Sequence, residues 1–595
     1  MVQAYAALIE TGSNQTYIFG TNKMRESVGA SELVRRVGTL WVIEALQKIF
    51  VVCKPLEAVL KASTTPLFTA ALRELAGPCS EQNQKLADNG FEIVLATSGK
   101  AMVFFTDQGK AKDFVWRVTS RALAEAPGLT VRGVVSEMID LDTATKQNAA
   151  DFNTEIHRKL ENMRNILPPA NFRERFWPIL EPCQTSGLPN SAFVQNRSYK
   201  NSVETPSLEK YSAISASSAR KDIMREGAFG RLNADSDNFG HVNYKDFADS
   251  VDDSSIAWVA FVHADGNGFG NFFLNLHNKI SGTKAREYFD SLRRFSLSLE
   301  LCSLQAFYDA STETFGKTNE CADLVPLVLG GDDLTVAIDG TKAVKFIAAY
   351  LKAFEKVTEE GNKLYGQPNE IKDLAKGDKF GAAAGVAIVK PHFPFHRAYE
   401  LSESLLKSAK QAKTKARDTE KPPVTFLSSF DFQVVYNDGA VKLKSAREEW
   451  DKEDFLLTAR PFVVTTKERY GVLDDTGKAW AKRRLYNPIE NAEAFSLTEA
   501  RDALAAKRKE GDFKAKALPR SQQKGLRDAL FEGKAVAEAR FDVLKKRHQA
   551  DFTKGETGFC WSGNLFQDDG EKGSSPTTLF LDAMDLVDIG EGKPK

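Results

Sequence analysis

The residues best suited to chemistry are two adjacent aspartates at a glycine turn. The motif Gly330-Gly331-Asp332-Asp333 lies between two apolar runs, 324–329 and 334–338. Two short apolar runs joined by a Gly-Gly turn predict a β-hairpin with both carboxylates at its tip. Adjacent carboxylates repel each other, so a fold that holds them together usually holds a cation as well. Hard oxygen ligands favour Mg²⁺ or Mn²⁺, the ions of phosphoryl chemistry, and an ordinary surface turn is the alternative.

A third aspartate follows one of the most apolar stretches of the chain. Residues 256–264 are nearly all apolar, which predicts a central strand, and they lead directly into Asp265. If that strand lies beside the hairpin, its end and the hairpin turn share one edge of the sheet. We therefore expect Asp265 to meet Asp332 and Asp333, and three carboxylates are enough to hold two divalent ions. Two such ions clamp the attacking oxygen and the leaving phosphate of an in-line displacement.

The residues after Asp265 favour phosphate binding. Gly266, Gly268 and Gly270 lack side chains, so backbone N–H groups there could approach a triphosphate closely. A helix that begins just beyond this loop would add the positive end of its dipole. Further along, Lys410 could reach the phosphates as a point charge, with a solvent-facing lysine as the alternative.

Three further residues are candidates by position alone. His263 could contact a nucleotide, but its alternation with apolar neighbours fits a packed histidine equally well. Ser296 and Asn271 could touch a base or a phosphate.

The elements that must position these side chains follow in a clear order. The hydrophobic spacing predicts helices over 284–310, 341–357 and 396–415, and strands over 380–389 and 424–427. Together with the first strand and the hairpin, the order is βαββαβ, a ferredoxin-like split βαβ unit over residues 255–435.

The N-terminal part, residues 1–150, repeats this order. It is predicted to contain strands over 4–10, 91–96, 101–105 and 129–139 and helices over 31–51 and 111–126. Its hairpin turns at Thr97-Ser98-Gly99-Lys100, with a lysine where the later unit has a metal ligand. We therefore predict a duplicated unit that binds no catalytic metal, and a merely shared topology is the alternative.

The two remaining regions carry weaker signals. Residues 151–254 combine a helix with a Ser-, Asn- and Asp-rich stretch, which indicates a connector with irregular structure. Residues 436–595 are mostly helical and charged, most clearly over 497–509 and 522–546. The basic residues there favour solvated helix faces over a specific RNA or partner site.

Composition argues against several classes of protein. Lys+Arg and Asp+Glu both number 80, and the zero net charge argues against a bulk nucleic-acid coat, though not against a local basic groove. No apolar run approaches the length of a membrane span, and the first residues do not form a signal peptide. The six cysteines include no C-x-x-C pair, which argues against a disulfide scaffold and favours a reducing, cytoplasmic setting.

Together, these motifs resemble a known family. They are similar to the second palm domain of the large polymerase-like subunit of type III CRISPR complexes, a domain related to the GGDEF diguanylate cyclases. The residues that carry the resemblance are His263-Ala264-Asp265-Gly266-Asn267-Gly268, Gly330-Gly331-Asp332-Asp333, Gly385-Val386-Ala387-Ile388, Phe393-Pro394-Phe395 and Ser408-Ala409-Lys410. The segment from Thr21 to Ser31 also resembles the start of a silent first palm. The resemblance covers about residues 255–430 and, less closely, 1–150.

The resemblance implies an α/β (α+β) fold with two ferredoxin-like palm domains, the first degenerate and the second active, a helical linker and a helical C-terminal domain. It implies an enzyme that joins nucleoside triphosphates, usually ATP, into cyclic oligonucleotide messengers of antiviral defence. Catalysis would fall on Asp265, Asp332 and Asp333, and Mg²⁺ or Mn²⁺ would be bound by these three residues and by Gly266. The implied nucleotide-binding set is Gly266, Asn267, Gly268, Phe269, Gly270, Gly330, Gly331 and Lys410.

The chain also departs from this family. No His-Asp dipeptide occurs, so we expect no DNA cleavage. The connector has only Cys183 where the family's zinc site uses several cysteines, so we expect no structural zinc. Two other functions stay open: a structural, target-RNA-binding subunit of a type III CRISPR complex, and a diguanylate-cyclase-like enzyme that uses GTP. The expected partners are nucleoside triphosphates, with RNA or CRISPR subunits as further candidates and no membrane.

Overall fold

The computed structural model describes most of the 595-residue chain. The described residues are 2–50, 54–61, 89–166, 179–195, 211–237, 244–316, 323–361, 370–375, 377–417, 423–436, 443–452, 454–490, 494–505, 514–515, 518–548, 556–557, 561, 563–567 and 575–590. Within these ranges, no helix combines the length and the apolar character that a bilayer crossing requires.

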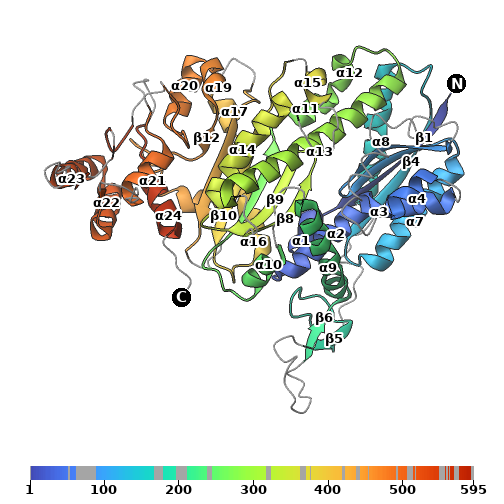
Figure 1. The fold of residues 1–595 in the computed structure, drawn as a ribbon, viewed down its shortest axis with the longest axis horizontal. Coiled ribbons are helices and arrows are strands. Elements are labelled where there is room, and N and C mark those ends of the chain that lie inside the picture. The colour runs from blue at the N-terminus through green and yellow to red at the C-terminus, as the bar shows by residue number, and fades with distance from the viewer. Residues whose placement is uncertain are drawn as a thin grey trace.

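The predicted βαββαβ unit is confirmed in the middle of the chain. Its strands are β7 (Val259–Gly266), β8 (Leu324–Gly330), β9 (Asp333–Asp339) and β10 (Ala382–Val389), which pair antiparallel in the order β10-β7-β9-β8. The crossover helices are α13 (Ala285–Phe315) and α14 (Ala343–Glu360), which lie side by side in Figure 1. A further helix, α16 (Phe395–Ala409), packs closely on β10, because Gly385 leaves no side chain between strand and helix.

This sheet extends beyond the unit that the pattern predicts. Strand β11 (Ser428–Val434) runs parallel to β10, and β12 (Phe462–Val464) follows antiparallel. The prediction of a strand over 424–427 was therefore wrong in position, because the observed strand begins at Ser428, directly after that range. The predicted helix 396–415 is also divided, since α16 ends at Ala409 and α17 covers only Ala412–Lys415.

The first unit has the same strand order. Strands β1 (Gln3–Gly12), β2 (Phe91–Thr97), β3 (Lys100–Phe105) and β4 (Thr130–Asp140) form a sheet in the order β2-β3-β1-β4. Read from the other side, this is fourth-first-third-second, as in the β10-β7-β9-β8 sheet. After the short α1 (Asn14–Phe19), the predicted helix 31–51 begins earlier and is broken, as α2 (Met24–Gly38) and α3 (Leu40–Ile49). The second crossover helix is α7 (Gln108–Glu125).

The connector is more regular than its polar sequence suggests. It contains α8 (Lys146–Ile166), a hairpin of β5 (Ala192–Gln195) and β6 (Tyr211–Ile214), α9 (Ala216–Asp237) and α10 (Tyr244–Asp252). The expectation of an irregular stretch was wrong over α9, which packs along α2. There, the buried Lys221 donates to Tyr17 O at 2.6 Å, so a polar side chain serves the packing.

Helices dominate the C-terminal part. They are α18 (Leu443–Arg447), α19 (Lys467–Val472), α20 (Asp475–Lys482), α21 (Leu497–Ala505), α22 (Arg520–Glu532), α23 (Lys534–Arg547) and α24 (Phe580–Gly590). The helix predicted over 522–546 is two helices, because Gly533 lies between them with φ 136°. Residues 506–509 of the other predicted helix lie outside the described residues. In Figure 1, these helices lie at the end of the molecule opposite the first unit.

One apolar core joins the two units. A continuous cluster of buried side chains includes residues of β1, β3, β7, β9, α2 and α13. At the junction, Phe104 of β3 meets Phe289 of α13 edge-on at 4.8 Å, and Phe19 stacks on Tyr399 of α16 at 4.5 Å. The two sheets therefore have a fixed relative position, and their hairpins face a common space.

Candidate active site

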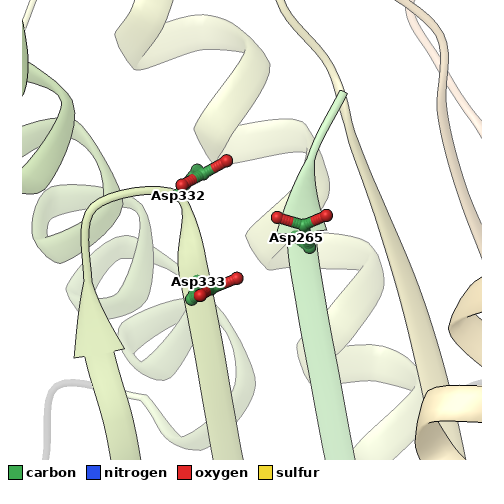
Figure 2. A group of neighbouring side chains, drawn as sticks. All are labelled: Asp265, Asp332 and Asp333. Atoms are coloured by element: carbon green, nitrogen blue, oxygen red, sulfur yellow. The ribbon is translucent and has the colours of Figure 1, made fainter. Parts of the chain in front are cut away.

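Three carboxylates meet at one edge of the β10-β7-β9-β8 sheet. Asp265 lies next to the end of β7, Asp332 lies in the hairpin turn and Asp333 begins β9 (Figure 2). One oxygen from each side chain lies within 4.8 Å of the other two. The strand register explains this meeting, because the β7–β9 pairing ends at Ala264 and Leu334, and the next residue of each strand toward the turn is Asp265 or Asp333. The predicted convergence of the three residues is thus present in the structure.

The hairpin turn depends on its first central glycine. Gly330 pairs with Asp333, which leaves a two-residue turn of Gly331 and Asp332. Gly331 adopts φ 62°, a left-handed conformation that glycine accepts without strain. The hydroxyl of Ser303 on α13 donates to Gly331 O, which fixes the turn against the helix.

The charges of the site are only partly balanced. Burial raises the pKa of Asp332, and burial together with the neighbouring Asp332 raises the pKa of Asp333 to about 7. The ammonium of Lys410 pairs with Asp265, and burial followed by repulsion from Lys413 lowers the pKa of Lys410. Three carboxylates against one ammonium leave an excess of negative charge at close range. The donor set therefore fits a divalent cation with oxygen ligands.

The loop after Asp265 is tightly enclosed at two of its three glycines. A Cβ on Gly266 would overlap the Phe269 ring and approach Asp332 Cβ to 2.9 Å. Gly268 adopts φ 87°, and a Cβ there would approach Thr425 Cγ2 to 2.9 Å. Gly270 has open space around it, so packing does not require a glycine there. The helix that follows, α11 (Phe269–Leu274), has only six residues, and its dipole is accordingly weaker than the sequence led us to expect.

Two of the predicted nucleotide-binding side chains face the protein interior. Asn267 is 1% exposed and donates its Nδ2 to Leu427 O at 3.0 Å. The Phe269 ring is also 1% exposed and stacks on Phe380. Both side chains hold the loop in place, and the backbone N–H of Asn267 also faces the protein, donating to Gly381 O at 2.9 Å.

His263 is packed in the protein interior, which was one of the two predictions for it; the other was contact with a nucleotide. Its Nδ1 lies 3.0 Å from Thr335 Oγ1, and its Nε2 lies 3.4 Å from the Tyr399 hydroxyl. Burial lowers the pKa of His263 to about 4, so the ring is neutral at physiological pH. Asn271 is exposed on α11, whereas Ser296 of α13 faces the cavity described next.

A cavity of about 470 Å³ opens beside Asp332 and Asp333 between the two units. The second unit contributes the turn Gly330–Asp333, Thr335, Ser296 and Tyr399. The first unit and α8 contribute Asn14, Gln15, Ser98, Lys100, Asn153 and His157. Sequence analysis missed the second group as ligand-binding candidates, apart from noting Lys100. No local motif marks them, because only the packing of one unit on the other brings them to the site.

The first unit carries an ion pair at the place that corresponds to the carboxylates. Thr97 pairs with Lys100 across a two-residue turn of Ser98 and Gly99, and Gly99 has φ 73°. Glu10 lies opposite Lys100 in the β1–β3 register, close to where Asp265 and Asp333 follow the last β7–β9 pair in the second unit. Lys100 Nζ is 3.5 Å from Glu10 Oε2. Among the described residues, the Asp265–Asp332–Asp333 group is the one cluster of His, Cys, Asp and Glu side chains close enough to share a metal ion.

Comparisons with known proteins agree with this geometry. Residues 258–419 match the family model of the Cas10/Cmr2 second palm domain. A chain in the apo-state cryo-EM structure of a type III-B Cmr-beta complex is 10% identical, with TM-score 0.51, and the match covers 99% of this chain and 82% of that one. A chain of the Csm1-Csm4 cassette crystallised with cA4 is 10% identical, with TM-score 0.36. That match covers 69% of the present chain and 53% of the Csm chain. The chain thus spans about half the length of that Csm protein, and no curated protein matches its sequence.

The TM-score of 0.51 over nearly the whole chain, at 10% identity, shows a shared fold. The family match covers the strands that carry Asp265, Asp332 and Asp333. Residues 258–419 match the second palm domain of the Cas10/Cmr2 type, and the chain as a whole shares its fold with the type III-B chain.

Proposed function

We propose that this protein is a metal-dependent nucleotidyltransferase that joins ATP into cyclic oligonucleotide messengers. The observation that carries the proposal is a cluster of three carboxylates, two of which, Asp332 and Asp333, line a cavity of about 470 Å³ between the two palms. Cavities of this size hold small-molecule ligands, and clustered carboxylates beside them suit metal-bound phosphates. The Csm1-Csm4 cassette, which was crystallised with cA4, indicates a product class but carries no argument for this chain.

Each part of the site has a role in this proposal. Asp265, Asp332 and Asp333 hold Mg²⁺ or Mn²⁺, which would polarise the α-phosphate and lower the pKa of an attacking 3′-hydroxyl. The backbone of Gly266–Gly270 approaches the triphosphate, and Lys410 stands beside Asp265 as a neutralising cation for the phosphates. Lys100 and the polar groups of the first palm bind the far side of the nucleotides. The enclosing walls exclude water and hold two nucleotides in one orientation.

The direct test is to incubate the pure protein with ATP, GTP or both, with Mg²⁺ or Mn²⁺, and to identify products by mass spectrometry. Cyclic products and pyrophosphate from ATP support the proposal, and they should vanish in Asp332→Asn/Asp333→Asn. Equal product from that variant would exclude the site, and product from GTP alone would favour a diguanylate-cyclase-like enzyme.

A structural role in an RNA-guided complex is the second candidate. The observation in its favour is the fold similarity to a chain of a type III-B complex over 99% of this chain. It predicts that guide RNA and smaller subunits co-purify with the protein and that the protein alone is silent toward ATP. In that case the assay should be repeated with target RNA, since the two roles can coexist in one complex.

A further inference from the structure

The loop Asp265–Gly270 is held by two segments from elsewhere in the fold. The N–H of Asn267 donates to Gly381 O at 2.9 Å, and its side chain donates to Leu427 O at 3.0 Å. The Phe269 ring stacks on Phe380, with 4.6 Å between the ring centroids. Residues 380–381 and 425–427 are in turn joined, because the Gly381 N–H donates to Thr425 O at 3.1 Å. The shape of the loop therefore depends on where these two segments lie.

Arg469, at the start of α19, binds both segments at once. Its guanidinium is buried, with the residue 2% exposed, and donates to Phe380 O at 2.9 Å and to Phe426 O. The same group donates to Glu359 on α14 and lies 3.4 Å from the carboxylate of Glu355. A planar guanidinium has five N–H donors in fixed directions and can satisfy these acceptors together. A single ammonium cannot span them.

We infer that Arg469 is a positioning residue for the nucleotide-binding loop and couples the C-terminal region to the active site. A buried guanidinium is stable only while its acceptors are in place, so α19 docks fully only when residues 380–381 and 425–427 have the observed arrangement. The coupling is reciprocal. A displacement of α19 would remove the hydrogen bonds that hold residues 380–381 and 425–427, and these segments in turn hold Asn267 and Phe269. The role of the loop in binding nucleotide rests on the proposed function, whereas the mechanical coupling does not.

The chain offers a matched control for this inference. Arg483 follows α20 in the same C-terminal region, is 7% exposed and donates to Ser575 O at 3.2 Å. Replacing it with lysine removes a buried guanidinium of comparable depth. Arg469→Lys and Arg483→Lys thus separate an effect on the loop from a general loss of packing.

The test is hydrogen exchange of the amides of Asn267 and Gly381 in the full chain, followed by mass spectrometry or NMR. In Arg469→Lys, both amides should exchange about tenfold faster than in the wild type, since each lost charged hydrogen bond weakens the support of the loop. In Arg483→Lys, they should exchange at the wild-type rate. Unchanged exchange in Arg469→Lys, or equal acceleration in both variants, would overturn the inference.

A milder variant covers the case in which Arg469→Lys does not fold. Glu359 is a half-exposed partner of Arg469, so Glu359→Gln weakens the anchor while leaving the core intact. Faster exchange at Asn267 with an unchanged melting temperature supports the coupling. Wild-type exchange at Asn267 in Glu359→Gln contradicts it.

Kinetics separate this inference from the proposed function. Where the wild type makes product, Arg469→Lys should raise KM for ATP about tenfold. Mn²⁺ binding in the absence of nucleotide should stay within about twofold, because Asp332 and Asp333 lie in the hairpin, outside the loop that Arg469 supports. A purely structural loss would lower the folded fraction without changing KM. A wild type that makes no product would overturn the proposed function, and the exchange experiment would still decide the coupling.

Discussion

The two palms have the same strand order and the same two-residue hairpin turn, but they place different charges at matching points. In the second palm, Asp265 and Asp333 lie directly beyond the last β7–β9 pair, with carboxylate oxygens within 4.8 Å of each other; in the first, Glu10 pairs with Lys100 across β1 and β3, with 3.5 Å between Nζ and Oε2. Two opposed carboxylates leave a charge that a cation must balance, whereas the ion pair balances itself. The fold therefore fixes where the two side chains meet, and the residue types decide whether a metal is needed.

The largest effect is expected when the second palm is made neutral like the first. Asp332→Asn/Asp333→Asn should lower cyclic product at least about a thousandfold, because the metal-bound transition state loses its ligands. In EDTA, the melting temperature should stay equal or rise, since a close carboxylate repulsion is removed. Mass spectrometry and calorimetry measure the two results.

The control for that variant lies in the first palm. Glu10→Gln removes the corresponding carboxylate from β1, and we expect product within about twofold of the wild type, since Glu10 is engaged by Lys100 on a half-exposed surface. A comparable loss in both variants would show that the palms are not functionally distinct.

The next largest effect is a pH dependence of metal binding, which is expected in the second palm because Asp333 lies there. The pKa of Asp333 is raised to about 7, so a proton competes with the metal below that pH. Affinity for Mn²⁺ should therefore fall as the pH is lowered from 8 to 6 and should level off above 8. Isothermal titration calorimetry gives the affinities, and a flat profile over this range would contradict the assignment of Asp333 as a ligand.

A smaller effect on activity is expected from replacing Lys100, the lysine that pairs with Glu10 in the first palm. Lys100 lines the shared cavity, so Lys100→Met should raise KM for ATP about fivefold through the loss of one positive charge at the cavity wall. The value of kcat should be unchanged, because the first palm takes no part in the metal chemistry. Steady-state kinetics measure both, and a fall in kcat on the scale of the aspartate variant would show that the palms share the chemical step.

The smallest effect concerns the cation inside the second palm. Lys410 is 30% exposed at its side chain, so its pair with Asp265 contributes at most about 1 kcal/mol to the free energy of unfolding. Lys410→Met should lower the melting temperature in EDTA by a few degrees at most and should increase the stabilisation that added Mn²⁺ provides. Equal stabilisation by Mn²⁺ in both proteins would show that Lys410 does not compete with the metal at Asp265.

The meeting of the three carboxylates could be predicted because local sequence signals mark them. The Gly330-Gly331 turn between apolar runs fixes the hairpin, and an apolar strand that ends at Asp265 must be central, so sheet topology alone brings the three aspartates together. The matching hairpin at Ser98-Gly99 was recognised by the same signal.

The cavity and the edge of the sheet could not be predicted in this way. Strand β11 reads Ser-Ser-Phe-Asp-Phe-Gln-Val, and its polar residues suggest a loop. They are buried because partners distant in sequence satisfy them, such as Arg447, which donates two hydrogen bonds to Asp431 at 2.7 Å. The cavity residues Asn153 and His157 likewise gain a role only from the packing of α8 and the first palm against the second. Arg469 lies in a run of charged residues, which is typical of a solvent-exposed segment. It is buried because carbonyl groups distant in sequence, Phe380 O and Phe426 O, accept its hydrogen bonds.

The most direct test of a single metal-binding palm is a crystal of the protein with Mn²⁺ and a non-hydrolysable ATP analogue, measured at the manganese absorption edge. The account predicts anomalous density among Asp265, Asp332 and Asp333, with nucleotide in the adjoining cavity, and none beside Glu10 and Lys100. Manganese at Glu10, or bound nucleotide with no manganese at the three aspartates, would contradict it.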